Sequence, residues 1–137
     1  MNPNDPSILA ALGTVYAKKG DYKNAILMLQ EGGKLHINNP FLLSSLGHVY
    51  GVAGKTSETQ EIANGFIEIS KKGYFPPMFI FRVYEGMGDV EKAVDWLEKA
   101  YEVRDPLLFT IKSLPSYDSM KSNKRLIALL KKMGLEN

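Results

Sequence analysis

The sequence predicts an all-α fold, an α-solenoid of three helical hairpins followed by C-terminal capping helices. Two patterns carry this prediction. Tyr16, Tyr50 and Tyr84 recur at a spacing of 34 residues, and a repeat of roughly 20–50 residues is typical of solenoids. Apolar residues around them follow the helical period and not the alternation of a strand, as at positions 9, 12 and 16 and at 22, 25, 26 and 29.

Glycines recur at fixed places around each tyrosine. A valine precedes each of these three tyrosines, and Gly20, Gly54 and Gly88 follow them four residues later. They come after the last periodic residue of a helix, where glycine suits a left-handed cap conformation. Gly13 and Gly47 fall inside helices, where glycine is unfavourable by about 0.5–1 kcal/mol relative to alanine. We therefore expect close approach of another backbone at these two positions.

The period and the order of residue types resemble the tetratricopeptide repeat, whose unit is two antiparallel helices. The second repeat departs from the pattern, because Thr59 and Phe66 stand where small residues are usual. The third repeat has Pro77 at the opening aromatic position and Phe81 at a position that is usually small. We expect the first helix of the third repeat to start late and to pack less closely. The first repeat matches the pattern with Leu9, Leu12, Gly13, Tyr16, Gly20, Tyr22, Ala25 and Leu29.

The 137 residues are expected to form a single domain. Asp21 and Asp89 are candidate N-caps, and Pro40 and Pro76 or Pro77 suit first-turn positions. The expected repeats span about 6–39, 40–73 and 74–107, with a C-terminal cap at 108–137. The expected helices span roughly 7–19, 22–36, 41–53, 57–71, 77–87 and 89–103.

The two ends of the chain differ. The C-terminal part of the chain resembles the end of tetratricopeptide regions in bacterial multidomain signalling proteins, most clearly at WLEKAYEVRDP and RLIALLKKMGL. In those proteins the repeats follow a winged-helix, nucleotide cyclase or protein kinase domain. An apolar stripe on a helix of about 122–133 would cover the last repeat. At the other end NPNDP reads as a connection between repeats, with no capping helix before it. We expect either a longer protein or self-association through helix 7–19.

Composition and charge exclude several classes of protein. The longest apolar runs are far shorter than a membrane span needs, and the absence of a secretory signal favours the cytoplasm. With no cysteine, packing alone holds the fold. The net charge of +2 is too small to argue for nucleic acid. Residues 74–103 carry three basic and six acidic side chains, and residues 104–137 carry seven and three, so we expect these segments to attract each other.

No pattern of catalytic or metal-ligating residues is found, so we expect no enzyme activity, no cofactor and no metal site. His36 falls near a helix end and is expected to be structural. His48 lies at a groove-facing position of the repeat, but no second histidine or carboxylate accompanies it at metal-ligand spacing. Trp96 fits the buried face of a helix.

The resemblance implies that a concave groove holds a protein or peptide partner. We expect a protein-interaction or scaffolding module, and the alternative is a sensory domain that binds an effector and regulates an attached DNA-binding or cyclase domain. Arg82 is the only groove cation that could grip a C-terminal carboxylate, so no chaperone-tail clamp is expected. The residues that the resemblance places in the groove are Thr14, Phe41, Ser44, Ser45, His48, Phe75, Met78, Phe79 and Arg82.

Four apolar members of this set have a second interpretation. Phe41, Phe75, Met78 and Phe79 could anchor an amphipathic helix, because a methionine beside aromatic rings suits adaptable surfaces. Alternatively, two or three of them belong to the core beneath the C-terminal helix.

Overall fold

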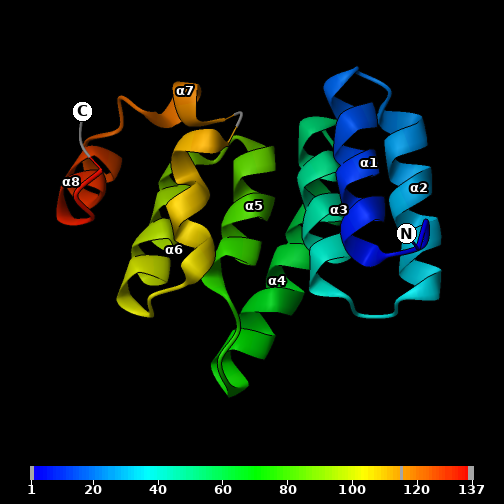
Figure 1. Ribbon diagram of the computed structural model, residues 1–137, viewed down its shortest axis with the longest axis horizontal. Helices are drawn as coiled ribbons and strands as arrows, with labels where there is room; N and C mark the ends of the chain where they lie inside the picture. Colours follow the sequence, from blue (N-terminus) through cyan, green and yellow to red (C-terminus); the bar gives the residue numbers. More distant parts are fainter. Residues whose placement is uncertain (1, 115, 136–137) are drawn as a thin grey trace.

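The computed structural model describes residues 2–114 and 116–135, and every regular element within them is helical. Three antiparallel hairpins follow one another along the molecule, with the first hairpin at one end and the C-terminal helix at the other (Figure 1). The helices agree with the expected ranges to within about two residues. They are α1 (Pro6–Lys18), α2 (Tyr22–Leu35), α3 (Pro40–Val52), α4 (Thr56–Lys72), α5 (Pro77–Met87), α6 (Val90–Glu102), the 3-10 helix η1 (Pro106–Ser113), α7 (Tyr117–Met120) and α8 (Lys124–Lys132).

The recurring tyrosine and glycine build one type of helix end three times. Gly20, Gly54 and Gly88 have positive φ angles of 82°, 82° and 77°, as the sequence predicts. After α1 the amide of Gly20 donates to Ala17 O, and the amide of the next residue donates to Tyr16 O. The same pair of bonds ends α3 and α5. This Schellman arrangement satisfies the last carbonyls of each helix and fixes the turn of each hairpin.

The predicted helix starts are confirmed. Asp21 accepts a hydrogen bond from Asn24 N, and Asp89 accepts one from Lys92 N. Pro40 and Pro77 are the first residues of α3 and α5, where the missing amide proton has no intrahelical partner to lose.

Close packing of the inner helices depends on a different pair of glycines from the pair expected. A Cβ on Gly51 would lie 2.6 Å from the backbone of Gly86, and a Cβ on Gly86 would clash with the backbone of His48. Here α3 and α5 touch backbone to backbone. At Gly13 and Gly47 the nearest atoms are side chains, of Leu29 and of Val83 and Ile62, so the expected backbone approach is wrong at those positions.

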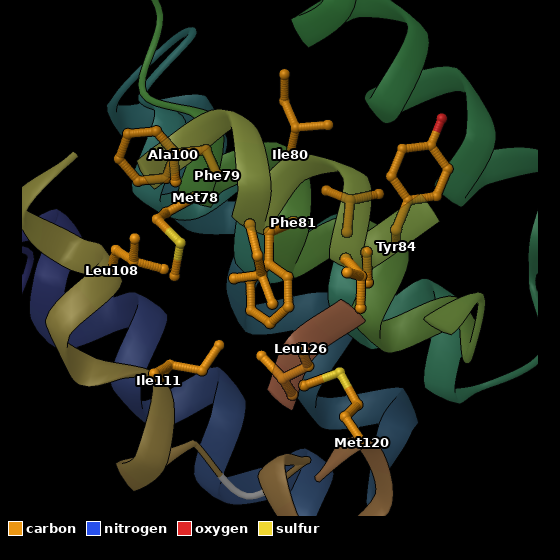
Figure 2. Packing of buried hydrophobic residues seen from close by; sticks show 14 of the residues in the cluster. Met78, Phe79, Ile80, Phe81, Tyr84, Ala100, Leu108, Ile111, Met120 and Leu126 are labelled. Carbon is orange, nitrogen blue, oxygen red and sulfur yellow. The ribbon is translucent and has the colours of Figure 1, made fainter. Parts of the chain in front are cut away.

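Helix α5 starts late in its repeat, at Pro77, as expected, but the prediction of looser packing is wrong. Seven of its residues are buried, and Phe81, which replaces the small residue of the earlier repeats, is only 1% exposed. The segment after α6 explains this. Leu108 and Ile111 of η1 and Leu126 of α8 lie in the same buried cluster as Phe81 (Figure 2).

The acidic and basic segments of the last third do attract each other. Arg125 of α8 forms ion pairs with Glu91, Asp95 and Glu98 of α6. Together with the buried leucines Leu126, Leu129 and Leu130, these pairs hold α8 against α6. The C-terminal helix is therefore a cap on the last hairpin, as its apolar stripe predicts.

A buried carboxylate ties the C-terminal segment to α5. The residue before α5 is Pro76, which provides no side-chain cap. Asp105, 2% exposed, accepts from Met78 N at 3.1 Å and from Leu107 N at 3.0 Å. One side chain thus caps both α5 and η1 across 27 residues of sequence.

The buried apolar residues form two clusters of unequal size. The larger joins α4, α5 and α6 to the C-terminal segment, and partly buried Trp96 packs against it. The smaller lies among α1, α2 and α3 around Leu29 and Leu42. None of the helices in residues 2–114 and 116–135 has the length and apolar character that crossing a bilayer requires.

Candidate functional site

A hollow of about 410 Å³ lies where the later halves of α1, α3 and α5 meet the segment between η1 and α7. Each inner helix contributes side chains to it, because residues one repeat apart occupy the same face of successive parallel helices. We call it the inner hollow. Its lining residues are Thr14, Ala17, Lys18, His48, Val52, Arg82, Glu85, Leu114 and Ser116.

Glu85 lies at the base of the inner hollow, and its side chain is only 2% exposed. Its Oε1 accepts from His48 Nδ1 at 3.2 Å and from Arg82 Nη1 at 3.1 Å. Its Oε2 accepts from Ser116 Oγ. Arg82 also donates from Nη2 to Thr14 Oγ1 at 3.3 Å. One carboxylate therefore joins α3, α5 and the C-terminal segment, and Arg82 extends the network to α1.

The surroundings of Glu85 act on its pKa in opposite directions. Burial alone raises the pKa of a carboxyl group, because the charged form loses water. The hydrogen bond and charge of His48, the Ser116 hydroxyl and the Arg82 guanidinium outweigh burial and bring the pKa of Glu85 below its ordinary value. Glu85 is thus ionised at neutral pH.

The hydrogen bonds of His48 define its tautomer. Nδ1 lies 3.1 Å from the carbonyl oxygen of Arg82 and 3.2 Å from the carboxylate of Glu85. Both partners are acceptors, so Nδ1 carries a proton. The ring is thereby fixed in orientation beside the hollow, with the imidazole side chain 18% exposed.

The polar groups of the inner hollow stabilise one another and do not form an activated nucleophile. Such a site needs a hydroxyl or thiol hydrogen-bonded to a base. Ser116 donates to the carboxylate of Glu85, and its hydroxyl has no hydrogen bond to His48. Among the described residues no group of three or more His, Cys, Asp or Glu side chains could hold a metal ion.

Three of the nine predicted groove residues meet at this site. Thr14, His48 and Arg82, from three successive repeats, line the inner hollow. The shared position of His48 and Arg82, 34 residues apart, is what the repeat spacing predicts.

The other six predicted residues lie outside the inner hollow. Ser44 and Ser45 are buried at 3% and 6% exposure, so a partner cannot reach them in this conformation. Met78 and Phe79 are buried within the larger cluster, and Phe75 packs against it. These three residues therefore belong to the core, which is the second interpretation given above for them. Phe41, 45% exposed, stacks edge-on against Phe79.

The central member of the network, Glu85, has no sequence signal that singles it out as buried. It is 37 residues from His48, and its exposure depends on the approach of α3 to α5 at Gly51 and Gly86. Leu114 and Ser116 come from the segment where the repeat pattern fades, so no periodicity places them at the hollow.

Comparisons with known proteins support the repeat. Residues 8–38 and residues 82–105 each match a family model described as the tetratricopeptide repeat. Over 97 residues the chain is 26% identical to the human protein O-mannosyl-transferase TMTC1, an alignment that covers 71% of this chain and 11% of that protein. The chain thus spans about a tenth of the length of this curated relative. No solved structure matches the chain.

The first match covers the α1–α2 hairpin and the second covers the end of α5 with α6. Both hairpins carry the Schellman turn and the aspartate N-cap described above. The molecule is therefore an all-α solenoid of tetratricopeptide-type hairpins with a C-terminal helical cap, and such repeats generally mediate protein–protein interaction.

Proposed function

We propose that the inner hollow is the contact site for a segment of a partner protein, and that the chain acts as an interaction module without catalysis. The observation that carries the proposal is the convergence of three successive inner helices on one hollow. Its floor is polar and held rigid by Glu85, whereas Ala17, Val52 and Leu114 add apolar surface. A preorganised site of this kind loses little entropy when it binds.

The lining favours a short segment with one apolar side chain next to polar or acidic groups. Val52 is 43% exposed and offers the apolar contact. Lys18 is exposed at the rim, and the Arg82 side chain is 23% exposed despite its pairing with Glu85. Both cations favour an anionic group on the partner.

Selection from a phage-displayed random peptide library tests the proposal. Peptides that bind the chain are compared on the wild-type protein and on Ala17→Arg, which fills the inner hollow without replacing a member of the Glu85 network. We expect Ala17→Arg to weaken the selected peptides by more than about tenfold, or about 1.4 kcal/mol. Ala128→Arg, on an exposed position of α8, is the matched control and should bind normally. Peptides that bind both variants equally would place the contact site elsewhere.

An effector-binding role is the second candidate, and the size of the hollow favours it. Small-molecule sites usually have volumes of about 300–1,000 Å³, and the inner hollow has about 410 Å³. In this case the ligand would be sensed here and the effect passed to an attached domain. A metabolite that raises the melting temperature of the wild-type chain, but not of Ala17→Arg, would support this role.

The setting of the module is a separate proposal. We propose that it acts in the cytoplasm within a bacterial signalling or regulatory protein. The support is the resemblance of WLEKAYEVRDP and RLIALLKKMGL to the tails of such proteins. In the structure WLEKAYEVRDP covers the second half of α6 and the Asp105 cap, and RLIALLKKMGL covers α8 from its second residue and the residues that follow it.

A further inference from the structure

The imidazole ring of His48 is hydrogen-bonded on one edge. Its Nδ1 lies 3.1 Å from the carbonyl oxygen of Arg82 and 3.2 Å from the carboxylate of Glu85. Within the part of the chain that the structure describes, no hydrogen bond involves Nε2 of this ring. The side chain lines the inner hollow and is 18% exposed. The edge of the ring that carries Nε2 can therefore meet a bound molecule.

A second proton changes what this edge offers to a ligand. In the neutral ring Nδ1 carries the proton and Nε2 is an acceptor, whereas in the charged ring both nitrogens are donors. Histidine is the side chain whose charge ordinarily changes between about pH 5 and about pH 8. The Nε2 edge of His48 therefore presents an acceptor in alkaline solution and a charged donor in mildly acidic solution.

The other charged groups of the inner hollow keep their charge near neutral pH. Glu85 is ionised, because its pKa is below its ordinary value of 4.5. The cations are Lys18 of α1 and Arg82 of α5, and lysine and arginine lose their proton only in strongly alkaline solution. Helices α2 and α4 also pack against α3, but they contribute no residue to the lining. Among the described lining residues, His48 alone therefore changes charge near neutral pH.

Protonation of His48 makes the lining more positive. The two cations exceed the one carboxylate by a single charge when the ring is neutral, and by two charges when the ring is protonated. Glu85 bonds the Nδ1 edge of the ring, so the second proton lies on the edge that Glu85 does not occupy. A carboxylate complements that edge, because a charge-assisted hydrogen bond is shorter and stronger than a neutral one.

We propose that the inner hollow binds an acidic side chain of the partner segment through protonated His48, so that binding takes up a proton and is stronger in mildly acidic solution. The proposal rests on the function proposed above, and adds to it the chemistry of the bound group and a dependence on pH. The partner's carboxylate accepts from Nε2, and Lys18 at the rim is a second cation near it. Because the bound state favours the protonated ring, the affinity is greatest below the pH at which the free ring loses its proton, and it falls as the pH rises.

Titration calorimetry tests the proposal. The probes are library peptides that are selected in mildly acidic buffer and lose binding in Ala17→Arg, since these occupy the inner hollow. We expect their affinity for the wild-type chain to be about tenfold higher at about pH 5.5 than at about pH 8. Buffers with different ionisation enthalpies should show proton uptake on binding. Replacing the acidic residue of a peptide by its amide should remove the difference between the two pH values.

Variants of the two histidines assign the effect to one ring. His48→Asn keeps a donor near the position of Nδ1, has no atom at the position of Nε2 and does not titrate, so its affinity should be the same at both pH values. His48→Gln places its amide near the position of Nε2 and should also bind independently of pH, which gives a second test if the first variant folds poorly. His36 is the matched control, because it lies outside the inner hollow near Asn4 O. The variant His36→Asn should retain the full pH dependence.

The possible results separate this proposal from the proposed function. Peptides that occupy the inner hollow with equal affinity at both pH values overturn this proposal and leave the proposed function standing. A pH dependence that survives in both His48 variants overturns it as well, because another group then takes up the proton. If no selected peptide distinguishes the wild type from Ala17→Arg, the contact site lies elsewhere, and the proposed function and this proposal fail together.

Discussion

At the scale of single residues, Glu85 is the least expected feature of the chain. Removing an ionised carboxylate from water is unfavourable unless charged or hydrogen-bonding partners replace the water. Here both oxygens are bonded, and the partners come from α3, α5 and the C-terminal segment. Glu85 therefore stabilises the relative positions of three parts of the chain, in addition to forming the floor of the inner hollow.

The variant Glu85→Gln should lower the free energy of unfolding at pH 7 by about 1–2 kcal/mol, because charge-assisted hydrogen bonds become neutral ones. The pKa of Glu85 is below its ordinary value of 4.5 in the folded chain, so its stabilisation is fully present above pH 4.5. It is lost as the pH falls through the lowered folded pKa. Urea unfolding at several pH values should show the wild type and Glu85→Gln converging in acid.

Glu68→Gln is the control for this prediction. Glu68 pairs with Lys71 on the surface, with side chains 64% exposed, and such pairs contribute little. We expect almost no change in its unfolding free energy at any pH. A gap between the wild type and Glu85→Gln that stays constant down to strong acid would contradict the role of the ionised carboxylate.

The residue scale also shows how far the sequence predicts the site. Thr14, His48 and Arg82 could be placed together because the 34-residue period assigns each residue a face. The period does not predict whether a side chain on that face is exposed, because exposure depends on how closely the neighbouring helices approach. Ser44 and Met78 occupy the same inner face, but they are buried, and no periodicity distinguishes them from the residues at the hollow.

At the scale of elements, the helices of the three hairpins were predictable because their ends are encoded locally. Tyrosine, glycine and aspartate at fixed spacing determine where one helix ends and the next begins. The expected helix at 122–133 is found as α8. The start of η1 is marked locally by Asp105 and Pro106, but η1 and α7 lie outside the repeat pattern. Their positions depend on long-range contacts, such as the hydrogen bond that Met78 N donates to Asp105 and the packing of Ile111 in one cluster with the α5 side chains.

The contact between α3 and α5 gives a test of helix packing. Gly51→Ala places a Cβ 2.6 Å from backbone atoms of Gly86 and Met87, and backbone cannot move aside as a flexible side chain can. We expect a loss of about 1–3 kcal/mol in unfolding free energy, as for other overpacked sites. The measurement is urea or thermal unfolding followed by circular dichroism.

Gly65→Ala is the matched control. Gly65 lies inside α4, and a Cβ there meets no atom within 4 Å. Alanine should therefore stabilise the chain by about 0.5–1 kcal/mol through its better helix propensity. If both substitutions stabilise, the inner helices do not touch at Gly51.

At the scale of the whole molecule, stability is distributed unevenly. In α5 seven residues are buried, whereas α1 buries only Ala10 and Gly13. The larger apolar cluster gathers α4, α5, α6 and the C-terminal segment, and the smaller one holds the first hairpin. In a solenoid each repeat is stabilised mainly by its neighbours. The first hairpin, which belongs to the smaller cluster, should therefore be less stable than the rest of the molecule.

Native-state hydrogen exchange should therefore show lower opening free energies in α1 and α2 than in α5 and α6. The gradient follows from burial and does not depend on helix propensity, since α1 and α5 are both well capped at their C-terminal ends. Mass-spectrometric analysis of peptides from each helix measures it, and equal protection of α1 and α5 would contradict the division into two clusters.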